Sequence, residues 1–234
     1  MTGDWNRLQV TTITKSNLKK DIPINIAVTV LLILLGMNFT LFGAGQNQLC
    51  RLDGAIMLGI FVWYLWSSFR SEKGADEESD IKIFPIWLAI AMIAGGLAGL
   101  VYGGRLFVNS ATEIAKGFGV SDKFIAITVM AAGTSMPELA TCIVAALKGR
   151  GQLALGNILG SNISNILLIL GGSALICPLS FGGMTSVDMG VMLISALFIL
   201  LSAILFKKMK LDRIEGCILV LMEVAYMWYL IANI

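Results

Sequence analysis

The sequence has 234 residues, of which 57% are hydrophobic and only 14% are charged, and its formal net charge is +2. Soluble domains carry roughly 25% charged residues, so this composition indicates a membrane protein that crosses the bilayer several times. The near-neutral charge gives no indication of nucleic-acid binding. The chain contains no histidine, which excludes Ser-His catalysis, HExxH zinc sites and histidine proton relays. We therefore expect neither an enzyme nor a bound cofactor.

Seven apolar segments are candidate transmembrane helices, each of which needs about 20 apolar residues. They span residues 22–42, 54–69, 84–109, 124–147, 153–177, 187–206 and 214–231. When the intervening segments are assigned alternately to the two sides, thirteen Lys and Arg residues fall on one side and four on the other. The positive-inside rule then predicts an N-terminus in the cytoplasm and a C-terminus outside. The expected fold class is an all-α polytopic membrane protein with about seven transmembrane helices.

An acidic stretch at residues 71–80 (SEKGADEESD) is the only long hydrophilic segment in the interior of the chain. We interpret residues 71–83 as a cytoplasmic linker between two helical bundles. Its acids are either a regulatory cation site or the side chains of a solvated loop.

An internal repeat links the second and seventh apolar segments. RLDG at 51–54 opens one helix and RIEG at 213–216 opens the other, and both helices end in Trp and Tyr. The predicted topology orients the two copies in opposite directions, as in many secondary transporters. The second copy has three helices ahead of its pair and the first copy has none, so we expect three further helices upstream.

A polar cluster at residues 133–138 (GTSMPE) interrupts the fourth apolar segment. A charged side chain at the bilayer centre costs at least ~2.5–3.5 kcal/mol, so we interpret Glu138 as a functional carboxylate. Thr134 and Ser135 lie about one helical turn before Glu138 on the same face. Either hydroxyl alone could instead bond its own helix backbone.

Pro137 is expected to leave nearby backbone carbonyls without their usual helical hydrogen bonds. It has no N–H to donate to the carbonyl of Gly133, so the carbonyls at 131–133 become available as ligands. Hydroxyls, a carboxylate and carbonyls form an all-oxygen set that suits hard cations such as Na⁺, Ca²⁺ or Mg²⁺.

The fifth apolar segment carries a second polar set within 156–165 (GNILGSNISN). Asn157, Ser161 and Asn165 recur every four residues and share one helix face, and Asn162 lies beside it. These side chains are either polar contacts between helices or neutral oxygen ligands opposite Glu138. Only residues 148–152 separate this helix from the preceding one, which predicts a tight hairpin.

The sequence alone does not assign a role to three further features. Gly95, Gly99 and Gly103 form a smooth helix face, for close packing or for sliding against a neighbour. Asn109 is expected at the outer end of the same helix. Glu223 lies in the middle of the last apolar segment with no obvious partner.

Three motifs together resemble the α-repeat of the cation/calcium exchanger superfamily, and most closely that of the prokaryotic sodium/calcium antiporters. They are AAGTSMPEL at 131–139, AALKG at 145–149 and GNILGSN at 156–162, with GVS at 119–121 as the lead-in. The resemblance implies a ten-helix fold of two inverted halves, in which this chain supplies the fourth to tenth helices. Residues 1–70 would hold the last two helices of the first half. Residues 84–234 would form the second half, with its α-repeat at about 119–172.

The resemblance also implies a function and a ligand set. Ca²⁺ and Na⁺ would be exchanged by alternating access at sites in the middle of the membrane, with helix 84–109 as a long gating helix. By motif position, the ligands would be the carboxylate of Glu138, the hydroxyls of Thr134 and Ser135, the carbonyl of Ala131, and Ser161 and Asn165 from the next helix.

Two departures affect this set: position 165 is Asn where some family repeats carry Asp, and Ser164 replaces a residue that is usually aromatic. Ca²⁺ takes about 6–8 oxygens, of which these side chains offer about half. A single carboxylate also leaves a divalent ion incompletely neutralised. We therefore expect a truncated or split part of an antiporter of the bacterial inner membrane, completed by a first-half polypeptide with the other α-repeat. The alternatives are a non-transporting remnant, a partner subunit of a full exchanger, and a calcium:proton antiporter.

Overall fold

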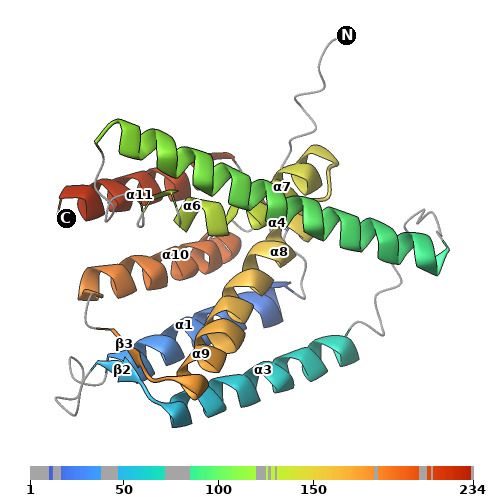
Figure 1. The fold of residues 1–234 in the computed structure, drawn as a ribbon. Coiled ribbons are helices and arrows are strands. Elements are labelled where there is room, and N and C mark those ends of the chain that lie inside the picture. The colour runs from blue at the N-terminus through green and yellow to red at the C-terminus, as the bar shows by residue number, and fades with distance from the viewer. Residues whose placement is uncertain are drawn as a thin grey trace. The chain divides into compact units, whose positions relative to one another are not determined.

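The chain folds almost entirely into helices in the computed structural model (Figure 1). The structure describes residues 11–12, 17–37, 47–71, 85–119, 125, 128–129, 131–181, 184–205, 210–211 and 213–232. The α-helices are α1 (Ile22–Gly36), α3 (Arg51–Ser71), α4 (Ile86–Gly117), α6 (Ala131–Thr134), α7 (Met136–Leu147), α8 (Gly151–Ser164), α9 (Gly171–Ile176), α10 (Ser186–Leu205) and α11 (Arg213–Ala232). Two π-helical segments, η2 (Asn17–Asp21) and η5 (Asn165–Leu170), and four strands, β1 (Thr11–Thr12), β2 (Gln48–Leu49), β3 (Leu179–Ser180) and β4 (Lys210–Leu211), complete the described elements.

Five of the described helices are long and apolar enough to cross a membrane, and two apolar helices are shorter. The long ones are α3, α4, the continuous run Gly151–Ile176, α10 and α11. The shorter ones are α1 and α7. They match the seven predicted segments in order, and the expected all-α polytopic membrane fold is confirmed.

The third predicted helix, 84–109, ended too early, because α4 continues to Gly117. The polar residues after Asn109 suggested a membrane boundary, but they do not break a helix. The helix stops where Gly119 adopts a φ of +75°, a left-handed conformation that glycine accepts readily. At 32 residues, α4 is about 48 Å long and exceeds the ~30 Å hydrocarbon core.

Several predicted features lie outside the described residues. They are residues 38–42 of the first predicted helix, most of 124–130 at the start of the fourth, residue 206 of the sixth, and the acidic linker after residue 71.

The chain divides into two compact units whose boundaries differ from the predicted halves, 1–70 and 84–234. Unit 1 comprises Met1–Ala75 and Ala145–Leu219, and unit 2 comprises Asp76–Val144 and Val220–Ile234. Unit 1 draws on both predicted halves because α3 packs against α9 and η5, and α1 packs against α10 and α8. The predicted halves describe the repeat along the sequence and stay a prediction.

Glycines allow the tightest helix contact of unit 1, between α3 and α9. A Cβ atom at Gly54 would lie 2.5 Å from the carbonyl oxygen of Gly171 and 2.6 Å from the amide nitrogen of Leu175. These are backbone atoms that cannot rotate away. The adjoining core contains Met57, Ile163 and other apolar side chains from α1, α3, α8 and η5.

Two pairs of short strands connect loop segments within unit 1. β1 pairs antiparallel with β4, and β2 pairs antiparallel with β3. Each pair joins segments that are far apart in the sequence. Apolar periodicity does not predict strands of two residues, so these contacts were not anticipated.

The two copies of the internal repeat begin in the same way. α3 starts at Arg51 and α11 starts at Arg213, and the acid at the third helical position is buried in each. Asp53 accepts a hydrogen bond from the Cys50 amide at 2.8 Å, so its carboxylate satisfies a backbone donor at the helix start. Burial of Glu215 at the equivalent position supports the proposed repeat.

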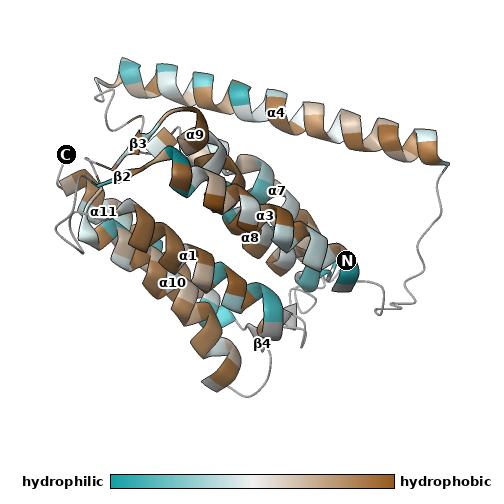
Figure 2. Ribbon diagram, turned by 90° about the horizontal axis from the view of Figure 1, so that it is seen from below, coloured by the Kyte–Doolittle hydropathy of each residue, from teal (hydrophilic) through white to brown (hydrophobic). Residues whose placement is uncertain are grey.

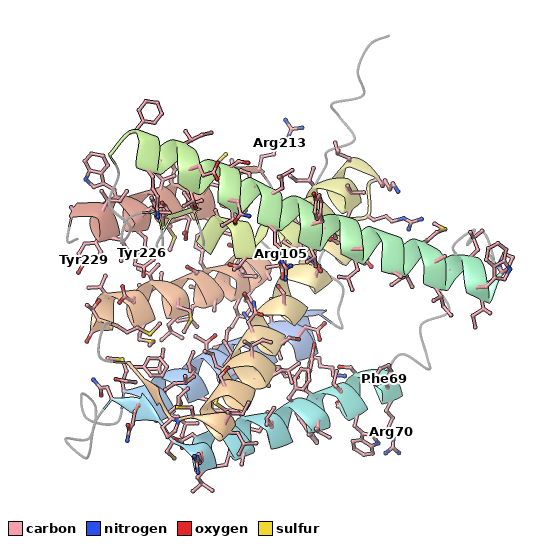
Figure 3. The ribbon with its side chains drawn as sticks, in the orientation of Figure 1. Phe69, Arg70, Arg105, Arg213, Tyr226 and Tyr229 are labelled. Atoms are coloured by element: carbon pink, nitrogen blue, oxygen red, sulfur yellow. The ribbon has the colours of Figure 1, made fainter. Side chains whose placement is uncertain are left out.

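The other end of α3 carries polar and aromatic contacts. Lys20 donates to the carbonyl oxygen of Ser67 at 2.8 Å, which satisfies an acceptor in the last turns of the helix. The guanidinium carbon of Arg70 lies 5.4 Å from the centroid of the Trp66 ring (Figure 3). A cation beside an exposed Trp is typical of a membrane–water interface.

In unit 2, α4 presents a long apolar surface. Its residues 86–104 contain no charged side chain, and hydrophilic bands recur only in its C-terminal part (Figure 2). No α4 residue is buried. Nothing that the structure describes lies within 4 Å of a Cβ built at Gly95, Gly99 or Gly103, so the predicted packing face has no neighbour in the described part of the chain.

We predict that Gly54→Ala lowers the stability of the chain by about 1–3 kcal/mol, because the added methyl would overlap fixed backbone atoms of α9. Thermal unfolding of the purified chain in detergent measures this. Gly59→Ala is the matched control in the same helix, because no atom lies within 4 Å of its Cβ position. Equal melting temperatures for the two variants would contradict the close α3–α9 contact.

Candidate cation site

The polar cluster at 133–138 breaks a helix. α6 ends at Thr134, α7 begins at Met136, and Ser135 forms the turn between them. The Ser135 amide donates to Ala132 O at 3.2 Å, an i→i+3 contact that tightens the end of α6. The role of the Ala131 carbonyl as a ligand stays a prediction.

Helical bonding resumes directly after the break. The Leu139 amide donates to Ser135 O at 3.0 Å, and the Thr141 hydroxyl donates to Pro137 O at 2.8 Å. Glu138 lies in the first turn of α7, where the positive end of the helix dipole favours a carboxylate. Its Oε2 atom is buried, although the side chain as a whole is only half-buried. Thr134 and Ser135 are exposed beside it in the sequence.

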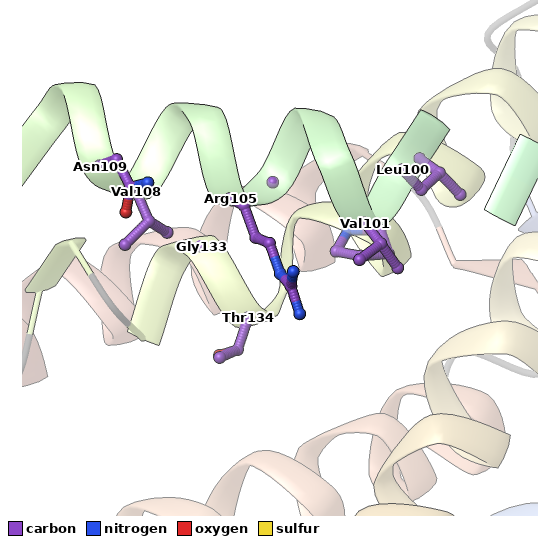
Figure 4. Close-up of a pocket in the computed structure, with 9 residues that line it drawn as sticks. Leu100, Val101, Arg105, Val108, Asn109, Gly133 and Thr134 are labelled. Atoms are coloured by element: carbon purple, nitrogen blue, oxygen red, sulfur yellow. The ribbon is translucent and has the colours of Figure 1, made fainter. Parts of the chain in front are cut away.

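α4 packs directly against α6 at Gly133. A Cβ atom on Gly133 would overlap Cγ2 of Val108, and a Cβ atom on Gly104 would lie 3.7 Å from the Gly133 carbonyl oxygen. Next to this contact is a cavity of about 270 Å³ between α4 and the α6–α7 break. Its lining is mainly apolar, and its polar members are Arg105, Asn109 and Thr134 (Figure 4).

Arg105 is a residue of this site that sequence reasoning missed. Arg105 is one of the four Lys and Arg residues that the topology prediction places outside, and Asn109 is predicted at a helix end. In the structure, Arg105 extends from α4 toward Thr134 (Figure 4). Arg105 directly follows Gly103 and Gly104. Small residues of this kind indicate a close helix contact, so the sequence could have indicated that Arg105 lies beside one.

The second predicted ligand set lies in unit 1. Asn157 and Ser161 are half-buried, and Asn162 and Asn165 are exposed. Ser161 donates to Ile158 O at 3.1 Å, so the hydroxyl bonds its own helix and its oxygen keeps an acceptor lone pair. The helix changes from α to π at Asn165. π-Helical turns are frequent at functional sites, and apolar periodicity gave no sign of this one.

The structure therefore brings each predicted set together separately. Thr134, Ser135 and Glu138 follow one another across the α6–α7 break in unit 2. The asparagines and Ser161 follow one another along α8 and η5 in unit 1. Convergence of the two sets on one ion stays a prediction. No group of three acidic or cysteine side chains that could hold a metal ion occurs among the described residues.

Residues 88–232 match the family model described as "Sodium/calcium exchanger protein". The chain belongs to this family. The family is one of transporters, and the predicted membership of the cation/calcium exchanger superfamily is confirmed. The apolar helices and the family together make the chain an integral membrane protein.

Individual relatives agree with this assignment. The chain is 37% identical to CaxA of Alkalimonas amylolytica, over 92% of this chain and 69% of that protein. It is 40% identical to the sodium/calcium exchanger MaX1 of Methanosarcina acetivorans, over 56% of this chain and 37% of that one. The solved structure of the sodium-calcium exchanger NCX_Mj superposes with a TM-score of 0.75 at 26% identity, over 95% of this chain and 69% of that chain. The chain thus spans only part of the length of each.

We predict that Gly133→Ala separates α4 from α6 and destabilises the chain, because the new methyl overlaps Val108. Adding Val108→Ala removes the overlapping Cγ2 atom and should restore much of the lost melting temperature. Gly103→Ala, where no atom lies within 4 Å, is the control. A double variant no more stable than Gly133→Ala alone would contradict the α4–α6 contact as described.

Proposed function

We propose that the chain carries one cation-binding half of a calcium (cation):sodium antiporter that works by alternating access. The single observation that supports this most is the helix break at Ser135, which falls next to Thr134 and places Glu138 in the first turn of α7, within an apolar segment. Hard cations prefer such oxygen ligands. Family membership and the similarity to NCX_Mj and MaX1 support Ca²⁺ and Na⁺ as the transported ions.

The proposed ligands in α6 and α7 and the turn between them are the Glu138 carboxylate, the Thr134 and Ser135 hydroxyls and the Ala131 carbonyl. Ser161 and Asn165 are the proposed ligands from α8 and η5. Asn157 and Asn162 are proposed as supporting side chains of the same helix. Two structural details favour this assignment. The Ser135 amide makes a tight i→i+3 bond to Ala132 O at the break, and the helix widens into a π-turn at Asn165.

We further propose that a complementary polypeptide carrying the first α-repeat completes the transporter. α4 has no buried residue in this chain, although its residues 86–104 are apolar or glycine. Such a surface is expected to face either lipid or another helix. The charge distribution supports an orientation with a cytoplasmic N-terminus and 71–83 linker and an external C-terminus, and we propose the bacterial inner membrane as the location.

Arg105 is proposed to tune ion preference. It is a fixed positive charge in the cavity that Thr134 also lines. Coulomb repulsion is proportional to the charge of the ion, so the guanidinium disfavours a divalent cation twice as strongly, in free energy, as a monovalent one.

We predict that Glu138→Gln abolishes cation exchange, because the substitution removes the carboxylate charge and keeps the side-chain shape. The measurement is ⁴⁵Ca uptake driven by an outward Na⁺ gradient, in vesicles that contain the chain together with a first-half polypeptide from a relative. A parallel experiment driven by a proton gradient separates sodium from proton antiport.

The matched control is Glu223→Gln, which removes a carboxylate from the exposed side of α11. We expect this variant to retain uptake. Equal Na⁺-dependent uptake by Glu138→Gln and the unsubstituted chain would contradict the role of Glu138. Vesicles with the chain alone are expected to show little uptake.

A second prediction concerns Arg105→Gln, which should tighten Ca²⁺ binding more than Na⁺ binding. At low salt we expect the dissociation constant to fall about threefold for Na⁺ and about tenfold for Ca²⁺, because the repulsion energy scales with the charge of the ion. Arg105→Lys keeps the charge and should resemble the unsubstituted chain. Equal changes for both ions would assign the effect of Arg105 to structure instead of charge.

A further inference from the structure

Two of the buried polar side chains in the helix pair α1–α10 of unit 1 have an oxygen atom with no hydrogen-bond partner among the described residues. Asn25 is 3% exposed and Ser202 is 2% exposed. Their oxygen atoms, Asn25 Oδ1 and Ser202 Oγ, accept no hydrogen bond from any residue that the structure describes. Nearby Thr29 is equally buried, but its hydroxyl donates to the Asn25 backbone carbonyl at 2.9 Å.

Both side chains lie at the same end of the helix pair. Asn25 is in the first turn of α1, one turn from Ile22 on the buried face. Ser202 is in the last turn of α10 and directly precedes Ala203. Ile22 and Ala203 belong to one apolar cluster, so the start of α1 lies beside the end of α10 (Figure 2).

Buried polar groups in an apolar surrounding carry a desolvation cost unless they find hydrogen-bond partners. Replacing both residues with Leu or Ala would avoid that cost, yet the chain places an amide and a hydroxyl at one end of the same helix pair. A buried water molecule typically makes about three hydrogen bonds. The Asn25 amide, with one acceptor and two donors, and the Ser202 hydroxyl offer such partners.

We propose that Asn25 and Ser202 bind one water molecule that bridges α1 and α10 near the end of the membrane span. The ligand is a neutral molecule that donates to Asn25 Oδ1 and Ser202 Oγ. This water site is separate from the proposed cation ligands and does not depend on the transport function.

A double-mutant cycle on the purified chain in detergent tests the coupling of the two residues. We expect Asn25→Leu and Ser202→Ala each to lower the melting temperature by a few degrees. The double variant should melt close to the worse single variant, because either change already removes the bridge. Ser195→Ala is the matched control, because Ser195 donates to Val191 O in its own helix at 2.7 Å and should show no coupling to Asn25.

The melting temperatures follow a different pattern if no water bridges the two residues. If each polar group were simply buried without a bridge, removing it would leave the melting temperature unchanged or raise it, and the two changes would add. Either outcome would overturn the proposal.

A second measurement identifies the bridge as water. In vesicles containing the chain with ¹⁵N-labelled asparagine, water-edited solid-state NMR should transfer polarisation to the Asn25 side-chain amide, with the signal assigned from the Asn25→Leu spectrum. The transfer should be lost in Ser202→Ala. Thermal coupling without polarisation transfer would indicate a direct amide–hydroxyl bond and would overturn the water site.

Discussion

The oxygen-bearing break at Ser135 is the constraint on which the rest of the structure depends. A membrane helix normally satisfies every backbone group internally, so a break exposes groups that need partners. Pro137 removes a donor, a tight turn at Ser135 ends α6, and Glu138 adds a charge at the start of α7. We propose that a hard cation is the ligand that this break serves.

The surroundings of the break fit this interpretation. Gly133 permits α4 to approach α6 so closely that a methyl group would not fit, and the contact leaves a cavity beside Thr134. Arg105 introduces a fixed positive charge into that cavity. In the proposed function, repulsion from the guanidinium would weaken cation binding and so favour ion release. We therefore propose that Arg105 adjusts the affinity and that Glu138 creates it.

Apolar segment length and residue spacing predicted much of this molecule. All seven apolar segments became helices, and the repeat that pairs Asp53 with Glu215 has matching buried positions in the structure. The features that were missed depend on contacts between segments or on local helix geometry. The π-turn at Asn165, the paired two-residue strands and the Gly54–Gly171 crossing have no periodic signal. The end of α4 was misjudged because polarity was weighted above Gly119, the residue that stops the helix.

The central proposal is that the predicted ligands of α6–α7 and those of α8–η5 hold one cation. Anomalous diffraction from crystals of the chain in complex with a first-half polypeptide from a relative, grown with Sr²⁺ in place of Ca²⁺, tests it most directly. The account predicts one peak within about 2.6 Å of the Glu138 carboxylate, with an oxygen of Ser161 or Asn165 in the same coordination shell. A peak that Glu138 does not ligate, or one ligated by Glu138 with no oxygen from α8 or η5, would contradict it.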